Sequence, residues 1–183
     1  MSAQLNELVL KAKAGDADAF GELYTIYYKE MYAYACCVVG DSFFAQDAVS
    51  DAVLSAFKGI SGLKKPESFK GWLFKILNAS CKNQYNKMKS TLQLDENYDV
   101  ATGGDLEDLD LSQDLKAAME VLSREERQII FLSITCGEKS HDIAAILDMP
   151  AATVRSKQKR ALAKMRVRLS GYENNEKGGA DDE

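Results

Sequence analysis

Seven lysine and arginine side chains stand close together near the end of the sequence, with no acidic residue among them. They fall in the stretch VRSKQKRALAKMRVRL and are Arg155, Lys157, Lys159, Arg160, Lys164, Arg166 and Arg168. Cations at this density either bind a polyanion, such as the phosphate backbone of a nucleic acid, or are simply solvated on a helix surface. Because the formal net charge of the whole chain is -5, this positive segment needs its own explanation.

A second basic segment lies between residues 64 and 89, where Glu67 is the single acid. Its seven cations are Lys64, Lys65, Lys70, Lys75, Lys82, Lys87 and Lys89. Residues 95–114 have the opposite character, with eight acidic residues and no basic one. Physiological salt screens charges beyond roughly 8 Å, so a ligand that touches one basic segment responds to that segment and not to the net charge. The sequence therefore predicts two polyanion-facing surfaces joined by an acidic connector.

Two aspartates could form a contact site of a different kind. Asp47 and Asp51 lie four residues apart, on the side of a predicted helix away from its apolar stripe. They could be a solvated pair, but like charges at this spacing repel each other by a few tenths of a kcal/mol. A basic partner surface would relieve that repulsion, so we interpret these aspartates as a protein contact site.

The cysteines and the single histidine do not form a recognisable catalytic or metal-binding motif. Cys136 and His141 are five residues apart, but Gly137 and a predicted helix cap at Ser140 separate them and no third, orienting group is evident. The four cysteines lack the CxxC spacing of zinc sites and favour buried, reduced thiols; they are Cys36, Cys37, Cys81 and Cys136. We therefore expect no enzymatic activity, metal or cofactor.

Three aromatic residues in the second basic segment have two readings. Trp72, Phe74 and Tyr85 could stack on unpaired bases, a contact worth roughly 1 to 3 kcal/mol each. Trp72 falls on the apolar stripe of its predicted helix, which favours core packing. For Phe74 and Tyr85 both readings stay open.

Apolar periodicity predicts helices throughout the chain of 183 residues, which contains only two prolines. In the first half the spacing is helical over residues 8–40, 42–60 and 69–89, with a break at Gly15 and Asp16 and an N-cap at Ser68. No apolar run reaches the roughly 18 to 20 residues of a membrane span, and the first residues lack the pattern of a secretion signal. We expect a cytoplasmic protein.

The second half has the pattern of a helix-turn-helix. Ser123 and Glu126 have the spacing of a capping box, Ser140 is a predicted cap, and a turn at residues 148–150 precedes the last helix. The predicted core stripe of that helix is Val154, Ala161, Leu162, Met165 and Leu169. Ser156, Lys159 and Arg160 lie opposite this stripe, and Arg155, Lys157 and Lys164 lie on its flanks. In a helix-turn-helix the second helix enters the major groove of DNA. Binding to DNA phosphates and base edges would therefore account for the positive charge of residues 155–168.

The predicted fold is all-α, with two small helical domains at residues 1–90 and 115–172. Residues 91–114 form a flexible acidic linker and residues 173–183 a disordered tail. Fully extended, the linker reaches at most about 80 Å, which exceeds the roughly 34 to 36 Å of one duplex turn. The two domains can therefore reach DNA sites more than one turn apart.

Four sequence blocks, in this order, resemble the extracytoplasmic-function (ECF) sigma factors of bacterial RNA polymerase. The blocks are AKAGDADAFGELYTIYY, AQDAVSDAVLSAFKGI, FKGWLFKILNASCKNQYNK and the helix-turn-helix from LSREERQIIFL to SHDIAAILDMPAATVRSKQKRALAKMR. The similarity runs from about residue 5 to 169 and leaves only the linker unmatched. The sequence departs from the family pattern at Ser50, Asp51, Ala79, Asn83, Asp148 and Ala152.

The resemblance implies a role for each matching surface. Core polymerase would bind Asp47, Ser50, Asp51 and Leu54. The loop from Lys64 to Ser68 would hold a flipped base of the minus-ten promoter element, and the DNA strand would follow Lys64, Lys65, Lys75, Lys82, Asn83, Asn86 and Lys87. The last helix would bind the minus-thirty-five element through Arg155, Ser156, Lys157, Lys159, Arg160 and Lys164. The implied partners are core RNA polymerase, promoter DNA and an anti-sigma factor, with no small-molecule substrate.

Two other functions fit part of the sequence. A stand-alone helix-turn-helix regulator would explain residues 115–169 but gives the first 90 residues no role. A sigma-like decoy that only occupies an anti-sigma protein would not need the basic face of the last helix.

Overall fold

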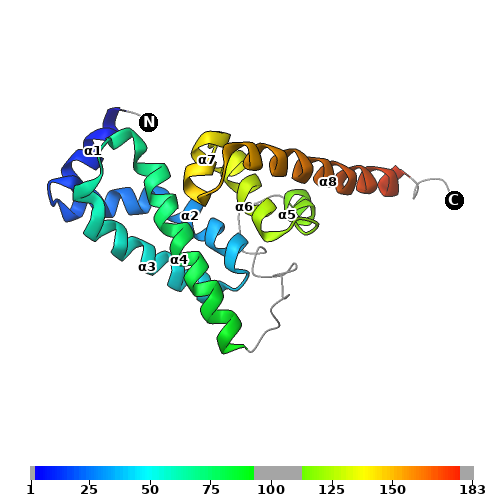
Figure 1. The fold of residues 1–183 in the computed structure, drawn as a ribbon, viewed down its shortest axis with the longest axis horizontal. Helices are drawn as coiled ribbons and strands as arrows, with labels where there is room; N and C mark the ends of the chain where they lie inside the picture. The colour runs from blue at the N-terminus through cyan, green and yellow to red at the C-terminus, as the bar shows by residue number, and fades with distance from the viewer. Residues whose placement is uncertain (1–2, 93–112, 178–183) are drawn as a thin grey trace.

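The computed structural model describes residues 3–92 and 113–177, and within these ranges all regular secondary structure is helical, in agreement with the predicted all-α class. The N-terminal half, residues 3–92, contains four α-helices, which Figure 1 labels. They are α1 (Ala3–Lys13), α2 (Ala17–Val39), α3 (Ser42–Gly59) and α4 (Phe69–Thr91). The C-terminal half, residues 113–177, contains α5 (Gln113–Met119), α6 (Arg124–Ile130), α7 (Ser140–Leu147) and α8 (Ala151–Lys177).

Local capping chemistry sets the helix starts in the N-terminal half. Gly15 has a φ of +98°, a conformation that L side chains rarely adopt, and the Asp16 side chain accepts a hydrogen bond of 3.0 Å from the backbone of Ala19. Asp41 caps α3 in the same way, through a 3.0 Å bond from the backbone N–H of Phe44. The predicted break at residues 15 and 16 is confirmed.

Ser68 is the N-cap residue of α4, as predicted, but it makes no capping hydrogen bond. Its hydroxyl donates instead to the carbonyl oxygen of Lys65 at 2.7 Å. The reason is the tight 3-10 turn Pro66–Ser68, which brings the Lys65 carbonyl within reach of the serine hydroxyl.

The C-terminal half follows the predicted helix-turn-helix pattern. The capping box is present, since the Ser123 backbone donates to Glu126 Oε2 at 3.0 Å and the Glu126 backbone donates to Ser123 Oγ at 3.4 Å. A π-helical turn, Phe131–Thr135, continues α6. Asp148 adopts the left-handed conformation, with φ of 56°, in the turn before α8.

Two predicted boundaries in the C-terminal half differ from the structure. Ser140 is the first residue of α7 rather than its cap, and its hydroxyl faces Gln158 of α8 at 3.4 Å. Helix α8 continues to Lys177, so five residues of the predicted disordered tail are helical. Most of the predicted linker, residues 93–112, and the last six residues of the tail lie outside the described residues.

One apolar core runs through both halves of the molecule. Its buried residues include Leu23, Met31 and Phe74 from the N-terminal half and Phe131 and Ile143 from the C-terminal half. Helix α4 packs against α7, and α2 packs against α6 (Figure 1). The two predicted domains therefore lie directly against each other.

A second, smaller core holds the C-terminal half together. It joins α5, α6 and α8 through Ala118, Leu122, Ile130, Ala161 and Met165. Val154 is fully buried in the main core, so the predicted stripe of α8 is largely correct. Leu162 is the exception, because 44% of its surface is exposed.

All four cysteines are buried free thiols, as the sequence predicts. Burial raises the pKa of Cys37 to about 12 and raises the pKa values of Cys81 and Cys136 still further. Among the described residues, every helix is too short or too polar to cross a bilayer.

Candidate nucleic-acid and polymerase interfaces

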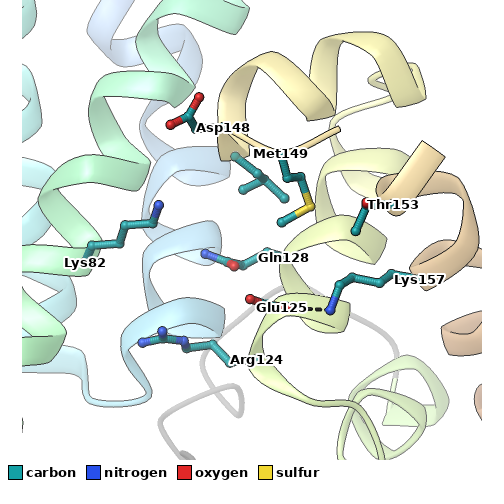
Figure 2. Close-up of a pocket in the computed structure, with 9 residues that line it drawn as sticks. Lys82, Arg124, Glu125, Gln128, Asp148, Met149, Thr153 and Lys157 are labelled. Atoms are coloured by element: carbon teal, nitrogen blue, oxygen red, sulfur yellow. Dashed lines mark hydrogen bonds and ion pairs between the residues drawn. The ribbon is translucent and has the colours of Figure 1, made fainter. Parts of the chain in front are cut away.

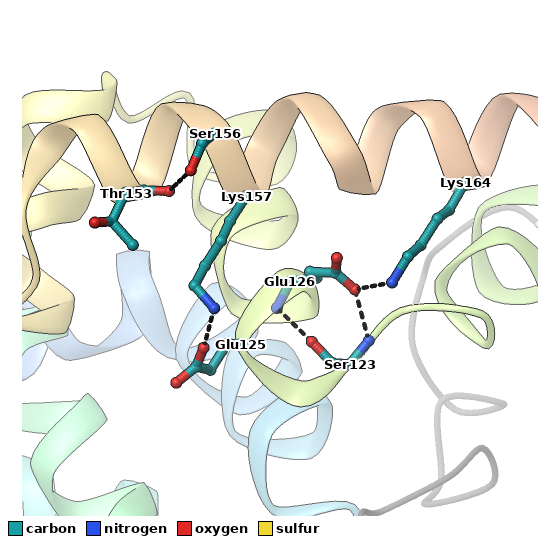
Figure 3. Close-up of polar contacts among 7 residues, drawn as sticks. All are labelled: Ser123, Glu125, Glu126, Thr153, Ser156, Lys157 and Lys164. Carbon is teal, nitrogen blue, oxygen red and sulfur yellow. Dashed lines mark hydrogen bonds and ion pairs between the residues drawn. The ribbon is translucent and has the colours of Figure 1, made fainter.

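Helix α8 presents the predicted DNA-reading residues to solvent. Arg155, Ser156, Lys159 and Arg160 are exposed, and Val154 and Ala161 are buried on the opposite side. The Ser156 hydroxyl donates to the carbonyl oxygen of Thr153 at 3.0 Å, one helical turn earlier (Figure 3). The three residues that the sequence places opposite the core stripe are thus exposed together on one side of the helix.

Two of the predicted DNA contacts on α8 are turned toward α6 instead. Lys157 Nζ lies 2.5 Å from Glu125 Oε2, and Lys164 Nζ lies 2.7 Å from Glu126 Oε2 (Figure 3). Lys157 is half-buried by this contact. In this structure both lysines hold α8 against α6, which leaves a narrower set of unpaired side chains on the outer face of α8. Two glutamates in the first turn of α6, Glu125 and Glu126, were the signal for this pairing in the sequence.

The Glu126 carboxylate connects the capping box to α8. Its Oε2 atom accepts hydrogen bonds both from Lys164 and from the backbone of Ser123. Burial alone would raise the pKa of Glu126, but the hydrogen bond from Lys164 and the bonds from Ser123 outweigh burial and hold this pKa below its usual value. The charged form of Glu126 is therefore stabilised in the folded protein.

Helix α4 and the loop before it carry the second predicted DNA surface. Lys64, Lys65, Lys75, Lys82, Asn83, Asn86 and Lys87 are all exposed. Lys75 lines a hollow of about 520 Å³ together with Glu67, Ser68 and Trp72 of the loop and helix start and with residues of α7. The predicted cations therefore remain accessible while the other side of α4 is buried.

The three aromatic residues of this segment differ in exposure. Phe74 is fully buried and Tyr85 is only 7% exposed, so in this arrangement both pack in the core. Trp72 is half-buried against Phe69, with 6.0 Å between the ring centroids. The reading of Phe74 and Tyr85 as base-stacking residues does not apply to this arrangement.

The predicted polymerase-binding residues lie on one side of α3. Ser50, Asp51 and Leu54 are exposed, Leu54 by 59%, and Asp47 is half-buried. The structure brings all four together, as the helical spacing predicts. The Ser50 hydroxyl donates to the backbone carbonyl of Gln46 at 2.9 Å, so it is directed along the helix.

Donors from α4 approach both aspartates of α3. Gln84 Nε2 donates to Asp51 Oδ2 at 2.7 Å, and Lys87 Nζ lies 3.8 Å from Asp47 Oδ2. The repulsion expected between the two aspartates is thus partly relieved within the chain. Gln84 itself is buried, and the sequence pattern did not identify it because its partner is 33 residues away.

A cavity of about 410 Å³ lies where the two halves meet (Figure 2). Its lining includes Lys82 of α4, Arg124, Glu125 and Gln128 of α6, and Lys157 of α8. Lys82 belongs to the first predicted DNA surface and Lys157 to the second. In this arrangement the two surfaces therefore border one shared cavity.

The pair Cys136 and His141 does not form a catalytic site. The His141 side chain is 90% exposed and its Nδ1 atom lies 3.5 Å from Asp142. Cys136 is buried, and burial raises the pKa of its thiol well above the usual value. The histidine is thus not placed to deprotonate the thiol.

Comparison with known families gives two matches. Residues 23–91 match the family description "Sigma-70 region 2", and residues 112–165 match "Sigma-70, region 4". The first covers α2, α3 and α4 from Leu23 onward, and the second covers α5, α6, α7 and most of α8.

Two bacterial sigma factors align with this chain over most of the length of both proteins. The ECF RNA polymerase sigma factor SigM of Mycobacterium tuberculosis is 28% identical over 170 residues, which cover 92% of this chain and 85% of SigM. The ECF RNA polymerase sigma-E factor of Escherichia coli is 28% identical over 185 aligned residues, covering 88% of this chain and 93% of the relative.

Two solved structures are similar over most of the chain. The sigma factor RpoE in complex with the anti-sigma factor NepR from Bartonella quintana has a TM-score of 0.66 and 25% identity, covering 82% of this chain and 96% of that one. The structure of CnrH in complex with the cytosolic domain of CnrY has a TM-score of 0.66 at 20% identity, covering 91% and 97% of the two chains.

Proposed function

Because this chain belongs to the sigma-70 family, as an ECF RNA polymerase sigma factor, we propose that its two halves divide promoter recognition between them. Its function is to direct RNA polymerase to promoters and to initiate transcription there. In the proposal residues 1–90 bind core polymerase and the minus-ten element, and residues 115–172 bind the minus-thirty-five element. Residues 91–114 connect the two.

The outer face of α8 is the observation that most directly supports this assignment. Ser156, Lys159 and Arg160 are exposed on the second helix of a helix-turn-helix, opposite the buried Val154 and Ala161. Side chains in this position contact base edges when the helix enters the major groove. Arg155 lies beside them and contacts the phosphate backbone or a base. Lys157 and Lys164 would have to break their ion pairs with Glu125 and Glu126 before they could bind DNA phosphates.

The polymerase-binding surface in the proposal consists of Asp47, Ser50, Asp51 and Leu54 on α3. An exposed leucine surrounded by acidic and hydroxyl side chains fits a partner that offers both an apolar patch and basic residues. The minus-ten element would follow the seven exposed lysine and asparagine residues of the loop and α4 named above.

Sigma factors regulate transcription and are not catalysts, and we propose that this chain likewise has no enzymatic activity of its own and acts in the cytoplasm. One similar solved structure holds the sigma factor RpoE in complex with the anti-sigma factor NepR, and the other holds CnrH in complex with the cytosolic domain of CnrY. We propose that an anti-sigma factor also binds this chain. The inducing signal would then act by releasing that factor.

Run-off transcription tests the proposal. The purified chain is added to core RNA polymerase and a library of genomic fragments, and transcripts are sequenced. Discrete start sites that share two upstream elements support the sigma function. Tight binding to an operator without polymerase would indicate a stand-alone regulator, and binding to polymerase without transcripts would indicate a decoy.

A further inference from the structure

A buried polar cluster sits in the interface between the two halves. It consists of Tyr34 of α2, Asn78 of α4 and Gln128 of α6, with exposed fractions of 0%, 3% and 5%. Gln128 Nε2 donates to Asn78 Oδ1 at 3.0 Å and lies 3.4 Å from the Tyr34 hydroxyl, which itself donates to Asn78 Oδ1 at 3.0 Å. Asn78 Nδ2 donates to the carbonyl oxygen of Ile146 in α7 at 3.3 Å. Two of these bonds join Gln128 to the N-terminal half, and one joins Asn78 to α7.

Two further contacts cross the interface on either side of this cluster. Lys70 Nζ, at the start of α4, donates to the carbonyl oxygen of Cys136 at 2.9 Å and pairs with Glu30 at 2.8 Å. Further along α4, the Arg124 guanidinium lies over the ring of Tyr85, 4.0 Å from its centroid. The C-terminal half therefore contacts α4 at its start, its middle and its later turns.

Apolar contacts fill the space between these polar ones. The Tyr34 ring packs edge-on against Phe74 of its own half at 5.7 Å and against Phe131 of the other half at 5.8 Å. Phe131 and Ile146 are 1% and 2% exposed. Separation of the halves would uncover these side chains.

This docked arrangement cannot hold both promoter elements at once. The minus-ten and minus-thirty-five elements are roughly 25 base pairs apart, or about 85 Å of duplex at 3.4 Å per base pair. Lys82 of the first proposed surface and Lys157 of the second border a single cavity of about 410 Å³. The halves must therefore separate before the chain can contact both elements.

We propose that the interface is a self-docking surface, and that the Tyr34–Asn78–Gln128 cluster, hereafter the polar latch, controls its release. This inference rests on the proposed function. In the docked state the C-terminal half occupies the side of α4 that carries Phe74, Asn78 and Tyr85, and it holds the two DNA-binding surfaces too close together. Binding to a two-element promoter requires the undocked state.

The chemistry of the latch suits an interface that opens. The bonds that cross the interface, from Gln128 Nε2 and from Asn78 Nδ2, can be exchanged for bonds to water when the halves separate, so they add little net stability. If the two halves packed together in any other orientation, these polar groups would be buried without partners, at a cost in free energy. The latch therefore favours one relative orientation of the halves. An entirely apolar interface of this size would lack that selectivity.

The test compares two glutamines of the C-terminal half. Gln128→Ala removes the latch donor, whereas Gln158→Ala removes a glutamine whose side chain bonds to Ser133 and Ser140 in its own half. Small-angle X-ray scattering of each full-length chain reports the radius of gyration. We expect a larger radius and about a tenfold rise in the undocked population for Gln128→Ala, equivalent to about 1.4 kcal/mol, and no change for Gln158→Ala. Gln128→Arg, which is too long for the site, should open the chain further.

DNA binding by the free chain completes the test. One probe carries a minus-thirty-five duplex joined to a pre-melted minus-ten segment, and the other carries the minus-thirty-five duplex alone. Gln128→Ala should bind the first about tenfold more tightly and the second unchanged, because α8 is already exposed in the docked state. An unchanged radius of gyration for both Gln128 variants overturns the docking proposal. A larger radius without tighter binding to the two-element probe overturns its inhibitory role.

The proposed function is checked separately by transcription with wild-type chain and core polymerase. If the wild type supports transcription but the radius of gyration of the Gln128 variants is unchanged, the self-docking proposal is rejected and the proposed function stands. Absence of transcription by the wild type rejects the proposed function, and the inhibitory role with it, whereas the scattering result still decides whether the halves dock.

Discussion

Gln84, buried in α4, donates a 2.7 Å hydrogen bond to Oδ2 of Asp51, an exposed acid on α3. The bond links the proposed minus-ten helix to the proposed polymerase-binding helix. A carboxylate held in one rotamer loses less conformational entropy when a partner binds. Gln84 is therefore expected to position Asp51 for its partner.

Gln84→Leu should weaken binding to core polymerase about two- to thirteenfold, since a single positioning hydrogen bond is worth about 0.5 to 1.5 kcal/mol. Fluorescence anisotropy with labelled chain and core polymerase measures the affinity. In an Asp51→Ala background the same change should have no further effect on affinity. Equal losses in both backgrounds would mean that Gln84 acts through the fold and not through Asp51.

Asp47→Arg combined with Asp51→Arg should abolish binding to core polymerase. Both carboxylates lie off the core, but Asp51→Arg leaves the buried Gln84 amide without its acceptor, so the melting temperature should fall modestly while the protein stays folded. A pull-down with core polymerase and a thermal melt measure the two properties. Retained polymerase binding by a folded double variant would remove α3 from the proposed interface.

Arg160→Ala should flatten the preference among minus-thirty-five sequences, because a bidentate base contact discriminates by roughly 1 to 3 kcal/mol. The measurement is transcription by reconstituted holoenzyme from a randomised upstream element at two salt concentrations. A contact to phosphate instead would lower transcription equally for all sequences and reduce the salt dependence. A uniform loss with base preference intact would therefore show that Arg160 does not read bases.

Lys164→Met should destabilise the C-terminal half by about 1 kcal/mol, because it leaves the buried carboxylate of Glu126 without its cationic partner. The sequence alone predicts a phosphate contact for Lys164, with a loss of transcription at every promoter. Urea unfolding separates the two roles. An unchanged unfolding free energy together with a lower salt slope for DNA binding would favour the phosphate contact.

The Glu126 interaction should also give the protein an acid sensitivity. The pKa of Glu126 is lowered in the folded state from its usual 4.5, so its stabilising contribution is complete above 4.5 and is lost as the pH falls through the lower, folded-state pKa. Urea unfolding of wild type and Lys164→Met at pH 7 and in this acid range measures the difference. The gap between the two proteins should shrink at the acid end.

The helices and the orientation of α8 could be predicted because their signals are local. The capping box at Ser123 and Glu126 and the turn at Asp148 span only a few residues, and the period of Val154, Ala161 and Met165 fixes which side of α8 is buried. The polar latch could not be predicted, since Gln128 and Tyr34 are 94 residues apart in the sequence. The ion pairs of Lys157 with Glu125 and of Lys164 with Glu126 were missed because a run of cations looks the same whether its partner is phosphate or a neighbouring helix, and the acidic first turn of α6 lies about 30 residues earlier in the sequence.

The shared core also has a consequence during synthesis. Helix α4 is complete at Thr91, but α7, which covers one of its sides, is complete only at Leu147. At 5 to 20 residues per second, a ribosome needs roughly 3 to 11 s to make the intervening chain. For the first part of that interval the nascent chain presents Phe74 and Tyr34 without the Phe131 that later packs against Tyr34, and throughout it α4 lacks α7, so this surface is open to chaperones until the C-terminal half emerges.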